Sequence, residues 1–575
     1  MPPVSMPPDS QPPVSASASE STGIDRRDFL KTVGAAVLAA GALPNAAAAA
    51  ASTHPTVRPQ RRTAGALPAQ PNILILITDQ ERHPQYWPAD WAATNLPNRK
   101  RLADSGLTFQ HAFCAASMCS PSRSTFFTGL YPEQHGVVDT LSFGGPASVD
   151  QPELPLDIQN MAKMLKSAGY AVQYRGKWHM SKGANGSADL TPQDIAAYGF
   201  DGWVPPDAGQ DANPANFGGG CPNNDQHYID QAVQFLQSPA ATSQPWALIV
   251  SLVNPHDVLS YAQSWDSQAG DGSDCYNYKF QAPGCFEQGI SLPPTYDENL
   301  RRNYKPTAHA QTVEFLAAGL GPLLPALHQP ERYVNFYAYV QTFTDKQIGQ
   351  LLDAFPPDLL DETVIFRFSD HGEMGLSHGG LRQKMFNVYE EMLNVPLVVS
   401  NPVLFSQAAQ TEALASLVDL MPTLATLAKV PDRNQWDFKG TDLMPVILDA
   451  SQHPTNPTAA VQDTVLFTFD DQNAGDTNPQ KVVEQPNHIR CIRDSRYKYA
   501  VYFDPSGVED QQYELYDLHE DPYELHNMAD PANTAYYDPV RTAEMAAKLK
   551  ARMAAAALSP IPPLIFMPAV EKTAG

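Results

Sequence analysis

The segment Cys119–Gly129, CSPSRSTFFTG, holds the residues of this chain with the most distinctive chemistry. Cys119 offers a thiol, and Arg123 follows it by four residues. On a helix this spacing places both side chains on one face, where the guanidinium can hold residue 119 through hydrogen bonds. Taken alone, Cys119 also fits a buried structural cysteine, the usual environment of a free thiol.

Two acidic positions follow predicted strands that lie far apart in the sequence. Asp79-Gln80 follows the apolar run 72–78, and Asp370-His371 follows the run 363–368. Open α/β sheets bind ligands at the carboxyl ends of their strands, so the two pairs can build one cation site. Carboxylate and amide oxygens suit a hard ion such as Ca²⁺ or Mg²⁺, whereas a histidine nitrogen also fits softer metals. A lone Asp after a strand is otherwise often a helix cap.

In order and spacing, these segments resemble the sulfatase family from residue 71 to about 530. Cys119–Gly129 is similar to the family signature Cys-x-Pro-Ser-Arg-x-x-x-x-Thr-Gly. The further segments that resemble the family are Gly169–His179, Asp370–Met374, Tyr389–Leu397, Val418–Thr423 and Tyr513–Leu518.

The resemblance implies that Cys119 is oxidised after translation to formylglycine. The aldehyde hydrates to a gem-diol, and one hydroxyl attacks the sulfur of a sulfate ester. The metal ligands would be Asp79, Asp370 and residue 119, with Gln80 and His371 completing the shell. One divalent ion is expected there, calcium first, with Mg²⁺ or Mn²⁺ as alternatives.

The resemblance also implies the roles of the basic residues. Arg123 would hold residue 119, and Lys177 would stabilise the anionic substrate. His256 and Lys384 would protonate the departing alkoxide. His179 would take the proton from the second hydroxyl, so that the aldehyde re-forms as sulfate leaves. His135 and His378 match less securely, and a structural role is the alternative for both.

Gln80 and His371 depart from the Asp and Asn that many sulfatases have at these positions. The Asp-Gln and Asp-His variants occur in branches that include choline sulfatases and phosphonate monoester hydrolases. The leading interpretation is therefore an exported sulfuric ester hydrolase. A phosphonate monoester or phosphodiester hydrolase is the nearest alternative, and an inactive binding protein with unmodified Cys119 is the third.

Buried apolar runs alternate with amphipathic segments, which predicts an α/β fold with a large, mainly parallel sheet flanked by helices. The expected strands are 72–78, 170–174, 246–253, 363–368 and 396–400, and the expected helices are 96–105, 156–168 and 333–355. Strands at 464–469, 487–492 and 497–503 and a helix at 540–557 predict a small antiparallel α+β subdomain. The expected catalytic domain is 71–439, with the C-terminal subdomain and tail at 440–575.

The N-terminus resembles a twin-arginine export signal. Arg26-Arg27 precede the apolar run 33–43 and the small residues 46–51, so 1–51 is expected to be a disordered start and signal, with 52–70 as a linker. The run is too short for a mature membrane anchor. Export through the twin-arginine translocase moves folded proteins, so a maturation enzyme can convert Cys119 before export. A periplasmic or secreted location is expected.

The formal net charge of -24 disfavours nucleic acid as a partner. A sulfate-ester small molecule or saccharide can still bind where a pocket concentrates positive charge. The sequence does not identify the substrate. The insertions 201–240 and 257–330 contain Trp203, Tyr261 and Trp265. These aromatic side chains either stack on a ring of the substrate or pack the loops. Cys275 and Cys285 either form a disulfide or remain free thiols.

Overall fold

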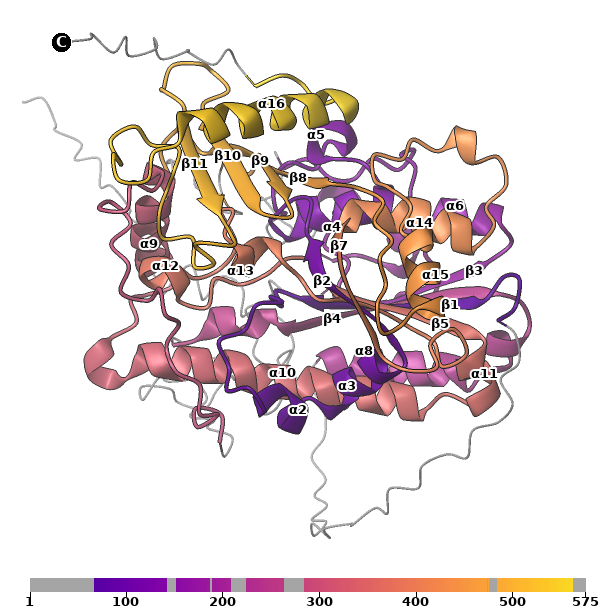
Figure 1. The fold of residues 1–575 in the computed structure, drawn as a ribbon. Helices are drawn as coiled ribbons and strands as arrows, with labels where there is room; N and C mark the ends of the chain where they lie inside the picture. The colour runs from indigo at the N-terminus through magenta and orange to yellow at the C-terminus, as the bar shows by residue number, and fades with distance from the viewer. Residues whose placement is uncertain are drawn as a thin grey trace, which may run out of the picture. The chain divides into compact units, whose positions relative to one another are not determined.

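A large sheet of seven strands, in the order β3-β4-β1-β5-β6-β2-β7, forms the centre of the molecule (Figure 1). The computed structural model describes residues 67–141, 151–186, 189–207, 224–262, 284–472, 474 and 483–561. The strands of the large sheet are β1 (Asn72–Asp79), β2 (Gly106–Phe113), β3 (Ala171–Gly176), β4 (Trp246–Pro255), β5 (Thr363–Ser369), β6 (Leu397–Ser400) and β7 (Ala409–Ser416).

All pairings in this sheet are parallel except those of β6, which runs antiparallel to both β5 and β2. The predicted mainly parallel α/β sheet is confirmed. Two of its strands, β2 and β7, were not expected from the sequence. Gly106 begins β2, and its Cα lies so close to the backbone of Val399 and Ser400 that there is no room for a side chain.

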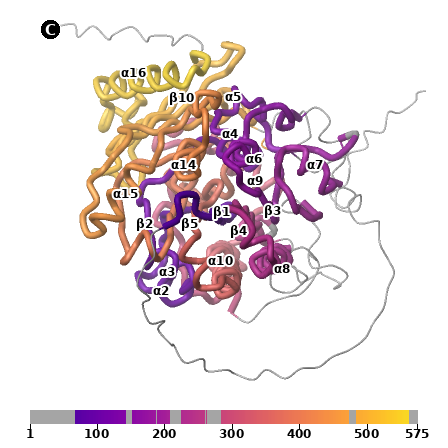
Figure 2. Tube along the Cα trace, turned by 90° about the vertical axis from the view of Figure 1, so that its right-hand side faces the viewer, coloured from indigo at the N-terminus to yellow at the C-terminus, as the bar shows by residue number. Residues whose placement is uncertain are grey.

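Helices cover both faces of the sheet (Figures 1 and 2). This covering is needed because β1 carries apolar side chains on both of its faces. Ile73, Ile75 and Ile77 point into one apolar cluster, and Leu74 and Leu76 point into another, so both faces of β1 are buried. The first face is covered by α4 (Cys119–Thr128), α6 (Met161–Ser167), α7 (Pro192–Ala196), α14 (Leu420–Leu427) and α15 (Met444–Gln452). The second face is covered by α3 (Pro97–Asp104), α8 (Asn224–Leu236), α10 (Gln329–Asp353) and α11 (Pro357–Asp361).

Two predicted segments differ from the structure. The helix expected at 156–168 begins only at Met161, because the side chain of Asn160 caps it by accepting a hydrogen bond from the backbone N–H of Lys163. The insertions expected as loops contain α8 and α9 (Thr307–Gly319). The remaining short helices are α2 (Trp91–Asn95), α5 (Pro132–His135), α12 (Ser377–Gly380) and α13 (Glu390–Leu393).

A second, antiparallel sheet near the C-terminus has the order β11-β10-β9-β8. Its strands are β8 (Thr464–Phe469), β9 (His488–Asp494), β10 (Tyr497–Phe503) and β11 (Gln512–Asp517). Helix α16 (Pro539–Ala555) packs Met545, Leu549 and Met553 against one face (Figure 1). The predicted antiparallel α+β unit is confirmed, with β11 as an additional strand.

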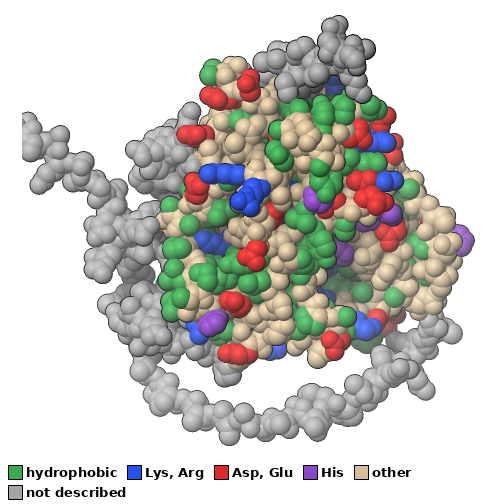
Figure 3. Space-filling view, turned by 60° about the vertical axis from the view of Figure 1, so that its left-hand side comes forward, with side chains coloured by type: hydrophobic (Ala, Val, Ile, Leu, Met, Phe, Trp, Pro, Cys, Tyr) green, Lys and Arg blue, Asp and Glu red, His purple; other side chains and the backbone are tan. Residues whose placement is uncertain are grey.

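The surface carries charges of both signs. On the face shown in Figure 3, outside the grey atoms, Lys and Arg lie in small groups among Asp, Glu and hydrophobic side chains. In the described part of the chain, no helix has the length and apolar character needed to cross a membrane. Several positively charged side chains are buried within the fold, among them Arg123, Lys177 and Lys384.

Candidate active site

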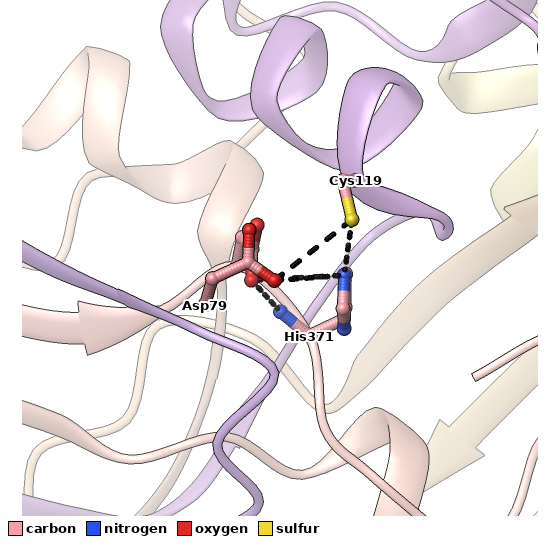
Figure 4. A group of neighbouring side chains, drawn as sticks. Asp79, Cys119 and His371 are labelled. Atoms are coloured by element: carbon pink, nitrogen blue, oxygen red, sulfur yellow. Dashed lines mark hydrogen bonds and ion pairs between the residues drawn. The ribbon is translucent and has the colours of Figure 1, made fainter. Parts of the chain in front are cut away.

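Asp79 and Asp370 meet at one edge of the large sheet. Asp79 ends β1, and Asp370 follows directly after β5. The strands pair in parallel with Thr78 opposite Ser369, so the two acids lie at adjacent strand ends. Cys119 is the first residue of α4, and its side chain points toward Asp79 and His371 (Figure 4).

Asp79, Cys119, Asp370 and His371 form what we call the Cys119 cluster. Each offers one ligating atom, and these atoms lie within 4.8 Å of one another, all buried. The Cys119 sulfur is 3.1 Å from Nε2 of His371 and 3.8 Å from Oδ1 of Asp79. His371 donates Nδ1–H to the carbonyl of Gly372 at 3.0 Å, which leaves Nε2 facing the cluster. Two carboxylates and an imidazole nitrogen at this spacing suit a divalent cation.

Cations of the protein contact one oxygen of each carboxylate and leave the other for the cluster. Arg123 Nη2 lies 2.9 Å from Oδ2 of Asp79 and 3.0 Å from Oδ2 of Asp370. Lys177 Nζ lies 2.5 Å from the same oxygen of Asp79. The Oδ1 atoms instead lie 3.8 Å (Asp79) and 3.7 Å (Asp370) from Nε2 of His371. The acids are thus held on their outer side while their inner oxygens converge.

The electrostatics of the cluster favour ionised groups at its centre. Burial raises the pKa of the Cys119 thiol, but the charges of Lys177, Lys384 and His371 outweigh burial. The net result is a pKa well below the ordinary value of a thiol. The pKa of Asp79 likewise falls below its usual range, because Lys177 and other cations outweigh burial. For Asp370, burial and the charge of Asp79 raise the pKa to about 6.

Two histidines from other elements face Cys119. His256 follows β4, and burial together with Lys177 and Lys384 lowers its pKa to about 4, which favours the neutral ring. His256 and His179 both interact with the Cys119 side chain. His179 also donates Nε2–H to the carbonyl of Leu141 at 2.6 Å, so its ring is held from two sides.

The turn that carries His179 is anchored by Asp207. His179 has a φ of 55°, a conformation that is costly for a residue with a side chain. The Asp207 carboxylate accepts hydrogen bonds from the backbone N–H groups of Trp178 at 2.7 Å and His179 at 2.8 Å. Asp207 therefore stabilises the turn that brings His179 to Cys119.

Gln80 lies beside the cluster, with its side chain bound to two neighbours. Its Oε1 accepts a hydrogen bond from Lys384 Nζ at 2.5 Å, and its Nε2 donates to Oε2 of Glu373 at 2.5 Å. Its backbone N–H donates to Oδ1 of Asp370 at 3.1 Å. Gln80 thus connects Asp370 to Lys384.

Comparison with known proteins decides the family. Residues 71–430 match the sulfatase family, which is more than half of the 575 residues. This chain belongs to the sulfatase family. The match confirms the resemblance seen in the sequence, and the enzyme class is that of the sulfuric ester hydrolases. Residues 378–556 of the sulfatase also match the C-terminal region of N-sulphoglucosamine sulphohydrolase.

Individual relatives are distant but cover most of the sulfatase. It is 24% identical over 478 residues to the uncharacterized sulfatase YidJ of Escherichia coli (strain K12), covering 80% of this chain and 83% of that one. It is 26% identical over 501 residues to the choline-sulfatase of Rhizobium meliloti (strain 1021), with the same coverages, 80% and 83%.

Solved structures share the fold. A structure in complex with its substrate D-glucosamine-2-N,6-O-disulfate is similar at a TM-score of 0.62 and 19% identity, covering 85% of this chain and 98% of that chain. The phosphonate monoester hydrolase of Agrobacterium radiobacter is similar at a TM-score of 0.59 and 21% identity, covering 85% and 96%. At these identities the likeness shows the fold alone.

The structure brings together the site residues expected from the sequence, from distant segments of the sulfatase. The two less secure histidines lie elsewhere: His135 contacts Thr125 Oγ1 at 3.1 Å, and His378 contacts Glu298 at 2.6 Å. Trp203 and Tyr261 are buried, so they pack the fold, and Trp265 and Cys275 lie outside the described residues. The proposed Cys275–Cys285 disulfide therefore stays a prediction.

Two residues of the site were missed. Glu373 lies within the segment Asp370–Met374, so its acidic side chain beside two ligand candidates was a usable signal. Asp207 lies in an insertion without a recognisable pattern, and its contacts with Trp178 and His179 appear only in the folded chain.

Proposed function

We propose that this sulfatase hydrolyses a sulfate ester to an alcohol and inorganic sulfate, using formylglycine at position 119 and one divalent metal. The observation that carries the proposal is the placement of Cys119. Its sulfur lies at the start of α4, 3.1 Å from His371 and 3.8 Å from Asp79, among buried cations. In this arrangement the sulfur stands for the oxygen that the hydrated aldehyde would present.

The residues around position 119 divide the proton transfers between them. When formylglycine is present, its hydrate supplies a hydroxyl that bonds to sulfur as the S–O bond to the alcohol breaks. Asp370 takes the proton of the attacking hydroxyl, and Lys384, together with His256 in its protonated form, donates a proton to the departing alkoxide. His179 accepts the proton of the second hydroxyl as the bond between residue 119 and the sulfate group is released, and water rehydrates the aldehyde. Arg123 and Lys177 hold the Asp79 carboxylate in place.

The donor set fits one hard divalent cation, with Ca²⁺ expected and Mg²⁺ or Mn²⁺ as alternatives. Asp79, Asp370, His371 and residue 119 would hold it, and Gln80 Oε1 is the neighbouring candidate oxygen. The ion would supply positive charge that activates the hydroxyl and neutralises the sulfate. Removal of the ion with a chelator should abolish activity, and Ca²⁺ should restore more of it than Mg²⁺ or Mn²⁺.

For the substrate class, we propose a sulfated saccharide or another small sulfate ester. The names of relatives support this choice: one acts on ulvan and another on choline sulfate, and a structural neighbour holds a glucosamine disulfate. A phosphonate monoester hydrolase is the second candidate, because Gln80 and His371 replace the commoner Asp and Asn and one neighbour has that activity.

One experiment separates these substrates. Fully converted enzyme, with the aldehyde at 119 verified by peptide mass, is assayed on sulfated sugars, aryl sulfates, choline sulfate and phosphonate monoesters. A higher kcat/KM for a sulfate ester supports the proposal. A preference for the phosphonate by tenfold or more would replace it with the second candidate.

We also propose export to the periplasm or the medium through the twin-arginine translocase, after conversion of Cys119 by a maturation enzyme. The support is the sequence Asp25-Arg26-Arg27-Asp28-Phe29-Leu30-Lys31 ahead of an apolar run. Replacing Arg26 and Arg27 by Lys should retain the protein, with activity, in the cytoplasm. Unchanged export of that variant would refute this route.

A further inference from the structure

Glu373 lies in the same segment as Asp370 and His371, and its carboxylate is fully buried. Oε1 accepts hydrogen bonds from the hydroxyl of Tyr333 at 2.8 Å and from the backbone N–H groups of Gly375 at 3.0 Å and Gln383 at 2.9 Å. Oε2 accepts the hydrogen bond from Gln80. Three donors thus fix one oxygen, and the other is directed at Gln80.

Glu373 determines which end of the Gln80 amide faces Lys384. An ammonium group has no acceptor, and a carboxylate that accepts four hydrogen bonds has no proton to donate. Only one orientation of the amide satisfies both neighbours: Nε2 toward Glu373 and Oε1 toward Lys384. The reversed amide would place NH₂ against the ammonium and oxygen against the carboxylate, leaving buried groups unpaired.

The position of Lys384 matters for the reacting centre. Its Nζ donates to Oε1 of Gln80, whose backbone N–H donates to Oδ1 of Asp370 at 3.1 Å, so Lys384 is joined to the Cys119 cluster through Gln80. Lys384 is buried, and Gln80 and Gln383 are its hydrogen-bond acceptors, at 2.5 Å and 3.4 Å. The shorter of these bonds is the one that depends on the orientation of Gln80.

We propose that Glu373 is a positioning residue: through the amide of Gln80 it holds the Lys384 ammonium beside residue 119, ready to protonate the leaving oxygen. This inference rests on the proposed function for the use of that proton. The arrangement is needed because position 80 is Gln, whose amide has two unlike ends, whereas a carboxylate there would present two equivalent oxygens.

Three variants test the proposal: Glu373→Gln, Gln80→Glu and the double variant. Each is assayed on a sulfate ester with an alkyl leaving group and on one with a good aryl leaving group. In Glu373→Gln the amide at 373 faces the amide at 80, so kcat for the alkyl ester should fall about 100-fold, and that for the aryl ester less than about tenfold. Gln80→Glu places two carboxylates together and should lose at least as much.

The double variant reverses the polarity of the hydrogen bond and should recover at least about tenfold on the alkyl ester. The new amide at position 373 would accept the three donors through its oxygen and donate its N–H to the new carboxylate at position 80, which still accepts from Lys384. Tyr333→Phe is the matched control, because it removes a hydrogen bond to Glu373 without altering Gln80. Its ratio of alkyl to aryl kcat should stay within about twofold of the wild-type ratio.

Crystal structures of the wild type and of Glu373→Gln complete the test. An equal loss on both esters, no recovery in the double variant, or Lys384 unmoved in Glu373→Gln would overturn the positioning role. If the wild type hydrolyses no sulfate ester, the proposed function fails by itself. The position of Lys384 in the two crystal structures then still decides the inference about Glu373.

Discussion

Two buried clusters of charged side chains each include residues from the segment that follows β5. The two clusters differ in how their charges are neutralised. One is the Cys119 cluster. The other, here called the His378 cluster, comprises His378, Glu298, Glu391, Glu524 and Lys498. In both clusters, among the described residues, at least three ligating atoms lie within 4.8 Å of one another.

In the His378 cluster the protein itself supplies the counter-charges. His378 contacts Glu298 at 2.6 Å through Nδ1 and Glu391 at 3.6 Å through Nε2. Lys498 contacts Glu524 at 2.5 Å. In the Cys119 cluster, Arg123 and Lys177 instead contact the outer oxygens of the acids. Proximity of acids and a histidine therefore does not by itself indicate a metal site. What distinguishes the Cys119 cluster is that Arg123 and Lys177 pair with the outer oxygens of its acids and not with the inner ones.

The cysteines near the two clusters show the same contrast. Cys491 is buried beside the His378 cluster, and burial, with acids such as Glu514 and Glu524, raises its pKa well above the ordinary value. Cys119 is equally buried, yet its neighbouring cations lower its pKa. The Cys119 thiol is therefore favoured as an anion, whereas the Cys491 thiol is favoured as an inert neutral group.

The largest effect is expected for Cys119→Ala, with Cys491→Ala as its matched control. Loss of the covalent route should lower kcat by a factor of about 1,000 or more, several kcal/mol in transition-state stabilisation. Cys491→Ala should cost stability but keep kcat within a few-fold of the wild type. Comparable loss of kcat in both, for folded proteins, would erase the contrast between the two thiols.

Asp370→Asn and Glu524→Gln compare one acid from each cluster. The first change removes charge from the inner side of the Cys119 cluster, so bound metal and activity should both fall, activity by about 100-fold or more. Glu524→Gln should leave the bound metal at one ion per chain and lower the melting temperature. Metal content by elemental analysis and activity are measured on the same samples. Full metal content and activity in Asp370→Asn would remove Asp370 from the site.

His179 and His256 both face Cys119, and their variants separate release from attack. His179→Ala should cleave the ester once per active site and then stall with sulfate on residue 119. His256→Ala should slow the first cleavage by about 100-fold for poor leaving groups and less for a good aryl group. Rapid-quench measurements give the size of the burst. Equal slowing of the first turnover, with no sulfate trapped on residue 119, would contradict this division of roles.

The strands that position the Cys119 cluster could be predicted because they are buried on both faces. Ile73–Ile77 of β1 is a continuous apolar run, and Val364–Phe368 of β5 is apolar except for Arg367. Asp79 ends the first strand, and Asp370 follows the second. β2 and β7 were missed because polar residues such as Gln110 and Glu412 interrupt them. The antiparallel direction of β6 depends on pairing with strands distant in the sequence, which its four residues do not encode.

For the site, the sequence indicated residues within motifs but not the contacts that hold them. Cys119, Lys177 and His179 lie in segments with recognisable spacing. The link from Glu373 to Gln80 joins residues 293 positions apart. Such contacts are set by tertiary packing, so local pattern gives no account of them.

The smallest effect is expected for His378, as a dependence of stability on pH. Although burial lowers the pKa of His378, Glu391 and Glu298 raise it to about 8, from an ordinary value of 6.5. The folded protein thus binds this proton more tightly than the unfolded chain. The contribution to stability is complete below about pH 6.5 and is lost as the pH rises through 8, and it amounts to about 2 kcal/mol.

His378→Gln tests this directly, because a neutral side chain at 378 cannot titrate. The wild type should lose melting temperature between about pH 6.5 and 8.5, by a few degrees for a chain of this size. The variant should be less stable at about pH 6.5 and should show a smaller loss over the same range. His453→Gln, at an exposed histidine paired with Asp449, is the control and should keep the wild-type profile. Parallel pH profiles for the wild type and His378→Gln would show that His378 is not charged in the folded protein, and that the His378 cluster is not balanced by an imidazolium.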